Sequence, residues 1–213
     1  MKQSPIFAAA LLSLCFFSLR ASAESPDATS PAQVETLVCI RHGEKPANDQ
    51  GQLTFQGLNR SLALPDVLIK KYGRAGFVFA PGTQHPISHD GVPYCYIRPL
   101  ITIEPTAIRL ALPVDARFAF DEIEPLQKEL LSPAYQNSLV FIAWEHIKLE
   151  QFAKDMLDAL GADSSVVPHW PGKDYDSIYV LRIRTENGRR TATFAHDQEG
   201  LDGMSLQPPD PKK

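Results

Sequence analysis

The sequence has few cysteines, no excess of positive charge and, beyond its N-terminus, no apolar run long enough to span a membrane. It holds 3 Cys in 213 residues, too few for a disulfide-rich scaffold. Its 21 Lys and Arg against 25 Asp and Glu give a formal charge of −4, so it lacks the basic surface that binds nucleic acid or anionic membranes. With 44% hydrophobic and 22% charged residues, it has the composition of a globular domain.

The first 23 residues have the pattern of a secretory signal peptide. Lys2 precedes an apolar run at residues 6–19, and small residues occupy positions 21–23. The run is shorter than the roughly 20 residues that cross a bilayer, so an uncleaved anchor is the less favoured alternative. We expect cleavage after Ala23 and a periplasmic or secreted protein without a membrane contact in its mature form.

Removal of this leader changes the charge and the cysteine content. The mature chain would keep 19 basic and 25 acidic residues, a formal charge of −6. It would lose Cys15 and keep Cys39 and Cys95, so an oxidising compartment permits one disulfide at most. The sequence does not decide whether these two pair, and it does not indicate an oligomeric state.

The rest of the chain alternates between strand and helix patterns. Continuous apolar runs predict buried parallel strands, and helical patterns lie between them. An Asn-Gly pair at 187–188 predicts a turn that joins two further strands. The expected fold is an α/β three-layer sandwich with a mainly parallel central sheet flanked by helices and a terminal antiparallel hairpin. The strands are expected at 36–40, 77–80, 139–144, 177–184 and 189–196, and the helices at 53–73, 104–112, 124–132 and 148–161.

A single domain is expected at residues 35–200. Residues 24–34, rich in Ser, Pro, Ala and acids, predict a flexible lead-in, and the Pro-rich, charged residues 201–213 predict a disordered tail. The turn-rich stretch at 81–97 is long for a connection, and we expect it to border a functional pocket.

Two of the 6 His residues directly follow predicted strands. His42 comes after the strand at 36–40 and its neighbour Arg41, and His146 follows the strand at 139–144 by one residue. In open α/β sheets, functional groups collect at the carboxyl ends of the strands. If the two strands are neighbours, both imidazoles project into one pocket.

The motifs around these histidines resemble those of the histidine phosphatase superfamily, the group of phosphoglycerate mutases and acid phosphatases. They cover most of the mature chain and occur in the order of the family. They are RHG at 41–43, LTxxG at 53–57, Arg98 four residues before Thr102, TAIRLALPVD at 106–115, and a strand ending in His146.

The resemblance implies a metal-independent and cofactor-independent hydrolase of phosphate monoesters, whose substrate is a phosphorylated small molecule or phosphoprotein. His42 would be the nucleophile and form a phosphohistidine that water hydrolyses. Arg41 and Arg98 would hold the phosphoryl oxygens with paired donors. His146 would donate to the same oxygens, and Gly43 would let the backbone approach the site.

The general acid is the role with most candidates. It should be a carboxyl group that stays protonated near the working pH. Glu122 lies where one branch of the family places its acid, and Glu145 lies close to where another branch places an Asp. Glu44 and Asp121 are further alternatives.

Three features depart from the family pattern. Glu145 precedes the second histidine, where many members have Gly. Lys45 and Pro46 replace the Trp-Asn pair of the mutases, which favours hydrolysis over mutase activity. The stretch before Arg98 is long, so its assignment depends on the spacing to Thr102, and Arg109 is the competing candidate.

Two other functions are weighed against this one. His85, His89 and Asp90 are residue types that bind metals and would fit a metal-dependent hydrolase, although Pro86 argues against a helix that presents both histidines on one face. A member of the same fold that binds a phosphorylated ligand without turnover is the alternative if the acid is missing.

Overall fold

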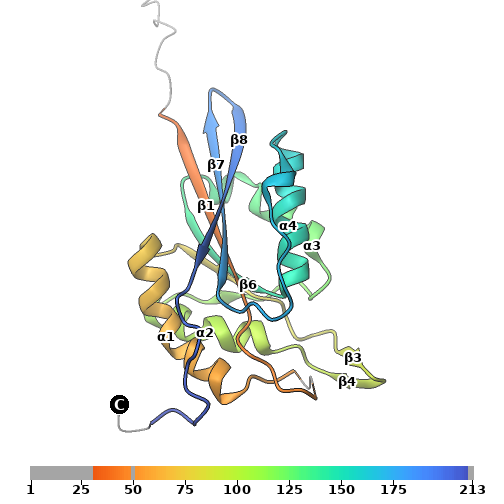
Figure 1. The fold of residues 1–213 in the computed structure, drawn as a ribbon. Helices are drawn as coiled ribbons and strands as arrows, with labels where there is room; N and C mark the ends of the chain where they lie inside the picture. The colour runs from red at the N-terminus through yellow and green to blue at the C-terminus, as the bar shows by residue number, and fades with distance from the viewer. Residues whose placement is uncertain (1–30, 49–50, 211–213) are drawn as a thin grey trace, which may run out of the picture.

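The protein is built around a six-stranded sheet with the strand order β5-β2-β6-β1-β7-β8 (Figure 1). The computed structural model describes residues 31–48 and 51–210, so the predicted leader lies outside the described residues. Two short strands form a separate hairpin. The strands are β1 Gln33–Arg41, β2 Phe77–Phe79, β3 Ile87–His89, β4 Val92–Tyr94, β5 Val114–Asp115, β6 Leu139–Trp144, β7 Ser177–Glu186 and β8 Arg189–Gln198.

The sheet is parallel through β5, β2, β6 and β1. Strand β7 pairs antiparallel with β1, and β8 pairs antiparallel with β7. In the pairing of β1 with β6, Arg41 lies opposite Trp144. The His42 N–H donates to the carbonyl of Trp144 at 3.0 Å. The residues that follow β1 and β6 therefore lie at one edge of the sheet, as the sequence predicted.

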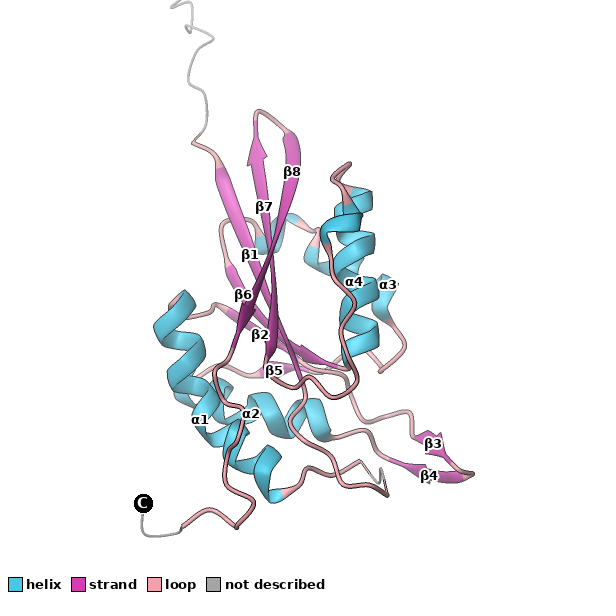
Figure 2. Ribbon diagram, in the orientation of Figure 1, coloured by secondary structure: helices cyan, strands magenta, loops and turns pink. Residues whose placement is uncertain are grey.

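Helices cover both faces of the sheet, which confirms the three-layer sandwich (Figure 2). Side chains of a strand alternate between the two faces. Val38 accordingly packs with Leu64 in the core on one side, and Cys39 packs with Phe152 in the core on the other. The helices of the first face are α1 Phe55–Tyr72 and α2 Arg98–Leu110, and those of the second are α3 Ile123–Leu130 and α4 His146–Ala159.

Local sequence signals account for α1 and for the terminal hairpin. The Thr54 hydroxyl accepts the Gly57 N–H at 3.1 Å, and Gly73 ends the helix with φ of 97°. Asn187 and Gly188 both have positive φ values, 50° and 74°, as a two-residue type I′ hairpin turn requires. Both elements were predicted from these residues.

The helix predicted at 104–112 begins six residues earlier, at Arg98. Pro99 fits the first turn of α2 because backbone N–H groups there have no partner within the helix, and proline has no N–H. Pro105, predicted for the first turn, lies inside the helix and leaves the Ile101 carbonyl without its usual donor. The hydroxyl of Ser61 in α1 donates to that carbonyl at 2.8 Å, so the neighbouring helix repairs the gap.

Both ends of the domain are longer than predicted. β1 begins at Gln33, which pairs with Thr185 of β7, so the last residues of the predicted lead-in belong to the sheet. The predicted disordered tail lies against α1 in its first part, because the Asn59 amide donates to the carbonyls of Ser205 and Gln207, both at 2.8 Å. Residues 24–30 and 211–213 lie outside the described residues.

Two further details were not read from the sequence. The stretch at 81–97 holds the β3–β4 hairpin, whose turn residues Asp90 and Gly91 have φ values of 49° and 77°. This Asp-Gly pair was a hairpin signal that the sequence analysis missed. Cys39 is buried, Cys95 is exposed and both are free thiols.

Candidate active site

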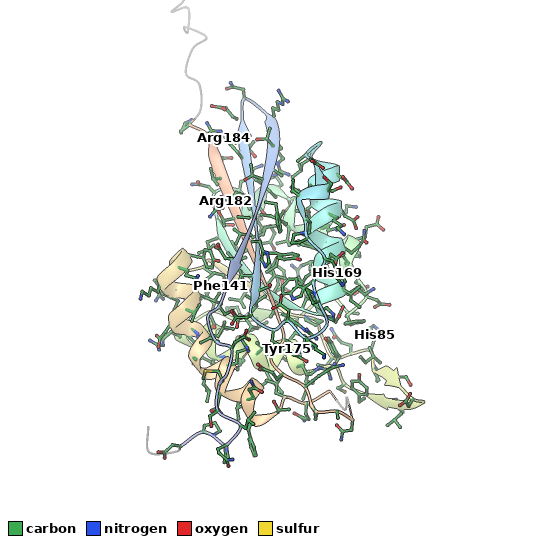
Figure 3. The ribbon with its side chains drawn as sticks, viewed as in Figure 1. His85, Phe141, His169, Tyr175, Arg182 and Arg184 are labelled. Carbon is green, nitrogen blue, oxygen red and sulfur yellow. The ribbon has the colours of Figure 1, made fainter. Side chains whose placement is uncertain are left out.

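Four predicted residues gather where β1 and β6 end. Arg41 is the last residue of β1 and His42 follows it, Arg98 begins α2, and His146 begins α4. Arg41, His42 and Arg98 are at most 3% exposed. Figure 3 labels Tyr175 at this edge of the sheet, with Arg184 at the opposite end.

His42 is held as a neutral imidazole with a defined tautomer. Its Nδ1 lies 2.7 Å from the Gly43 carbonyl, which only accepts, so Nδ1 carries the proton and Nε2 keeps its lone pair. Burial, followed by the positive charges of Arg98 and Arg41, lowers the pKa of His42 to about 3. The ring is therefore uncharged at neutral pH, and its Nε2 lone pair is a nucleophile.

A hydrogen-bonded chain explains the spacing between Arg98 and Thr102. The Gly43 N–H donates to the Thr102 hydroxyl at 2.9 Å, and this hydroxyl donates to the Arg98 carbonyl one helical turn earlier at 2.8 Å. Thr102 thereby joins the loop after β1 to the first turn of α2. The sequence marked the four-residue spacing but not this link between the two segments.

The RHG and LTxxG motifs meet in one close backbone contact. A Cβ on Gly43 would lie 2.9 Å from the Gly57 carbonyl oxygen, and a Cβ on Gly57 would lie 2.6 Å from the Glu44 carbonyl oxygen. Neither position has room for a side chain. The glycines bring the N-terminus of α1 against the loop that carries His42.

Arg41 is fixed by the loop that precedes β7. Its Nη1 donates to the carbonyls of Gly172 at 2.9 Å and Asp174 at 2.8 Å, and its guanidinium lies 3.9 Å from the ring centroid of Tyr175. Burial lowers the pKa of this guanidinium. Its buried Nε has no hydrogen-bond partner among the described residues. A buried donor without a partner is destabilising by about 1–3 kcal/mol, and an anionic oxygen would relieve that.

Arg98 and two helix N-termini add positive potential. The Arg98 guanidinium lies 4.6 Å from the ring centroid of Tyr96. Arg98 is the first residue of α2 and His146 the first of α4, so both helices direct their N-terminal dipoles toward this edge. The site is suited to an anion.

Glu145, the departure from the family pattern, holds the second histidine. Its carboxylate lies 2.5 Å from His146 Nδ1 and accepts the Lys148 N–H at 3.0 Å, which caps α4. Burial alone would raise the pKa of Glu145, but His146 and the backbone N–H groups of Ile147 and Lys148 lower it to about 2. A Cβ on Gly172 would lie 3.7 Å from His146 Nε2, so this nitrogen faces the loop that binds Arg41.

The other predicted acids are engaged elsewhere or exposed. Glu122 is exposed, and its carboxylate accepts the Ala119 N–H at 2.7 Å in the turn before α3. Asp121 is exposed, and Glu44 binds the buried Arg60 at 2.8 Å. Glu44 is therefore engaged with Arg60, whereas Glu122 and Asp121 lie at the exposed surface.

The competing arginine and the alternative metal group lie elsewhere. Arg109 is a half-exposed surface residue that pairs with Asp66 at 3.0 Å. His85 is exposed and lies beside the β3–β4 hairpin (Figure 3). Within the part of the chain that the structure describes, no three His, Cys, Asp or Glu side chains form a group that could hold a metal ion.

Two tyrosines complete the site, and sequence reasoning missed Tyr175. Tyr96 and Tyr175 place their rings edge-on to His42, with centroids 5.9 and 6.0 Å away. Tyr96 stands two residues before Arg98, which is a weak signal, but nothing in the segment around Tyr175 marks it in the sequence. Its place depends on the loop that returns from α4 to β7.

Comparisons with known proteins agree with this architecture. The sequence matches none of the protein families scanned and none of the curated proteins searched. Among solved structures, the chain is similar to the Putative Phosphohistidine Phosphatase SixA from Nakamurella multipartitia, with a TM-score of 0.52 and 17% identity over 77% of this chain and 95% of that chain. The chain shares the fold of that protein. The α/β sandwich expected from the alternating strand and helix patterns is thereby confirmed.

Two further solved structures match at greater distance. One is a phosphoserine phosphatase mutant from Entamoeba histolytica in complex with phosphoserine, with a TM-score of 0.45 and 12% identity over 78% of this chain and 98% of that chain. The other is the Putative Phosphohistidine Phosphatase SixA from Agrobacterium tumefaciens, with a TM-score of 0.46 and 11% identity over 76% and 97%.

Proposed function

We propose that the protein is a phosphatase that hydrolyses phosphate monoesters through a phosphohistidine on His42, without a metal ion. The state of His42 is the main support. The His42 ring is neutral, its Nε2 lone pair is not needed for the bond to Gly43, and two buried arginines, Arg41 and Arg98, lie close enough to lower its pKa. This combination is what nucleophilic attack on a bound phosphoryl group requires.

The reaction would proceed in two displacements at phosphorus. In the first, the Nε2 lone pair of His42 forms a bond to phosphorus while the bond to the ester oxygen breaks, and the leaving oxygen takes a proton. In the second, water attacks phosphorus, its proton passes to solvent, and the P–N bond breaks. The electron pair of that bond returns to Nε2, and inorganic phosphate leaves.

Arg41, Arg98 and His146 would stabilise the charge that spreads over the equatorial oxygens. The buried Nε of Arg41 supplies a donor for one of these oxygens. Because His146 Nδ1 faces Glu145, its Nε2 is the nitrogen directed at the phosphoryl group. These side chains supply the positive charge that metal ions supply in other phosphatases.

Glu122 is our candidate for the general acid. Glu145 lies closer to the second histidine, but a pKa of about 2 keeps it ionised and unable to donate a proton at neutral pH. Substrates whose leaving group needs little protonation should therefore react fastest. They include aryl phosphates and phosphohistidine, the substrate in the name of the Nakamurella protein, because imidazole is protonated near neutral pH.

The position of Glu122 also favours a second candidate function, the binding of a phosphorylated ligand without turnover. Its carboxylate is used in the Ala119 turn. If it does not leave that turn, phosphate esters with poor leaving groups would bind and not react.

We also propose that the protein is exported and acts in the periplasm or outside the cell. The proposal rests on the leader pattern of residues 1–23. Among the described residues, no helix combines the length and the apolar character needed to cross a membrane.

Phosphate release by the purified protein tests the proposal. The substrates are phenyl phosphate, a phosphohistidine peptide and a panel of natural monoesters, each with and without a chelator. We expect chelator-insensitive release that falls by about 10³-fold or more in His42→Ala, with the fold of the variant verified by circular dichroism. Release that persists in His42→Ala would reject the nucleophile. An absence of release, with phosphate still raising the Tm, would favour the binding-only function.

A further inference from the structure

Phe120 and Lys148, to which the proposed mechanism gives no role, lie near the aromatic residues of the site. The Phe120 ring centroid is 4.8 Å from that of Tyr96, which in turn lies 5.9 Å from the His42 ring. The Lys148 ammonium lies 5.5 Å from the centroid of Phe120. Phe120 and Lys148 are both half-buried, so each keeps an accessible part.

The backbone holds these two side chains at the same edge as the nucleophile. The indole N–H of Trp144, the last residue of β6, donates to the Phe120 carbonyl at 2.9 Å. The Lys148 N–H is fixed by Glu145 at the start of α4. The Phe120 segment is thus anchored on Trp144 and the first turn of α4 on Glu145, the two residues that directly precede His146.

The geometry of the proposed reaction suggests a role for Phe120 and Lys148. In an in-line displacement the leaving group departs from the side of phosphorus opposite to the nucleophile. In the proposed complex Arg41, Arg98 and His146 would bind the phosphoryl oxygens, and the leaving group would extend past them toward side chains at the rim. Phe120 is a half-buried aromatic ring near the site, and the Lys148 ammonium lies over it, 5.5 Å from its centroid.

We propose that Phe120 and Lys148 form a subsite for the leaving group and select a planar aromatic group that carries a carboxylate. The inference rests on the proposed phosphatase function and goes beyond it, because it names the class of leaving group. A flat ring packs edge-on or offset against Phe120. Its carboxylate pairs with Lys148, whereas a cationic leaving group would be repelled by Lys148 and both arginines.

Matched substrates and variants of the full chain test the subsite. The substrates are phenyl phosphate and 4-carboxyphenyl phosphate, and each variant is compared with the wild type on the same substrate, so that the different acidities of the phenols cancel. Lys148→Met keeps the stem and removes the charge. Lys154→Met, on the same helix and paired with Glu150 at 2.7 Å, is the control. Phe120→Leu removes the ring.

We expect Lys148→Met to raise the KM for 4-carboxyphenyl phosphate by about fivefold to tenfold and that for phenyl phosphate by less than about twofold, with kcat little changed. Phe120→Leu should raise both KM values. The control variant should alter neither. Equal effects of Lys148→Met on the two substrates would overturn the proposal, since Lys148 would then serve only to pack on Phe120.

Binding of phosphonates separates this inference from the proposed catalysis. Benzylphosphonate and 4-carboxybenzylphosphonate cannot be hydrolysed, and calorimetry reports their Kd values directly. If the wild type prefers the carboxylated compound and Lys148→Met loses that preference, the subsite is supported even where no phosphate is released. If phosphate is released in a His42-dependent manner and both phosphonates bind alike, the subsite is rejected and the phosphatase function stands.

Discussion

Replacement of Arg60 by Met should destabilise the protein more than the replacement of any other charged residue of α1 by a neutral one. Arg60 is fully buried and binds three buried carboxylates, at 2.8 Å to Glu44, 3.2 Å to Asp176 and 2.5 Å to Glu199. Burial alone would lower the pKa of Arg60, but Glu44 and Glu199 raise it above its ordinary value, so the guanidinium stays charged. The variant would leave buried carboxylates without a counter-charge.

The expected size follows from known losses of one partner in a buried ion pair, about 3–5 kcal/mol. For a chain of this length each kcal/mol shifts the Tm by about 2–4 °C, so the Tm should fall by roughly 6–20 °C. Arg109→Met is the matched control, because Arg109 and Asp66 are mostly exposed. Such a pair contributes little, and its Tm should stay within about 2 °C of the wild type.

The loss should grow with pH, which separates a charge effect from lost packing. Burial raises the pKa of Glu199 to about 8, with Asp176 and Glu44 adding to the rise and Arg60 opposing it. Without Arg60 the folded-state pKa rises further. Since the unfolded carboxyls release their protons from about pH 4.5 upward, the variant loses stability as the pH increases. Differential scanning fluorimetry at pH 5 and pH 8 measures this, and an equal Tm difference at both values, or one below about 3 °C at pH 8, would refute the reasoning.

Three further predictions concern backbone contacts and the second histidine. Gly57→Ala should lower both the Tm and kcat/KM, because its Cβ would lie 2.6 Å from the Glu44 carbonyl oxygen; unchanged thermal unfolding and kinetics would show that the contact relaxes freely. Ser61→Ala should lower stability by about 1–3 kcal/mol in urea unfolding by leaving the Ile101 carbonyl unbonded, and Ser61→Thr should retain most of it. The pKa of Glu145, lowered to about 2, gives stability that is present above about pH 4.5 and lost as the pH falls toward 2. Glu145→Gln should therefore flatten the acid limb of the stability curve by about 2–3 kcal/mol, and an unchanged limb would contradict the pairing with His146.

The parts of the fold that local chemistry determines could be predicted from the sequence. Buried strands appear as continuous apolar runs, which is why β6 was placed at its observed bounds. The Thr54 cap and the Asn187-Gly188 turn depend on residues within three or four positions of each other. The start of α2 was missed because Pro99 and Pro105 could each have stood in the first turn of the helix. Pro105 is tolerated inside the helix because Ser61, from another helix, donates to the Ile101 carbonyl, and the local sequence does not show that contact.

The candidate site divides in the same way. Arg41, His42 and His146 follow strands directly, so pattern and sheet topology suffice to bring them together. Tyr175 and the carbonyls that fix Arg41 come from a loop more than 130 residues later, and no local signal marks them. Glu145 was read as a departure from the family pattern, whereas its carboxylate caps α4 and binds the second histidine.

The charges of the site explain why His42 is stable there as a neutral ring. Arg41 and Arg98 are positive, Glu145 is negative, and His42 is uncharged because burial and the arginines oppose its protonation. With these groups alone the pocket carries one net positive charge. A phosphate dianion would reverse that sign, and the same field that lowers the pKa of His42 would be cancelled at the moment the ligand binds. Phosphate binding would therefore offset the electrostatic cost of burying two arginines, while burial keeps the His42 ring neutral, as the proposed attack on phosphorus requires.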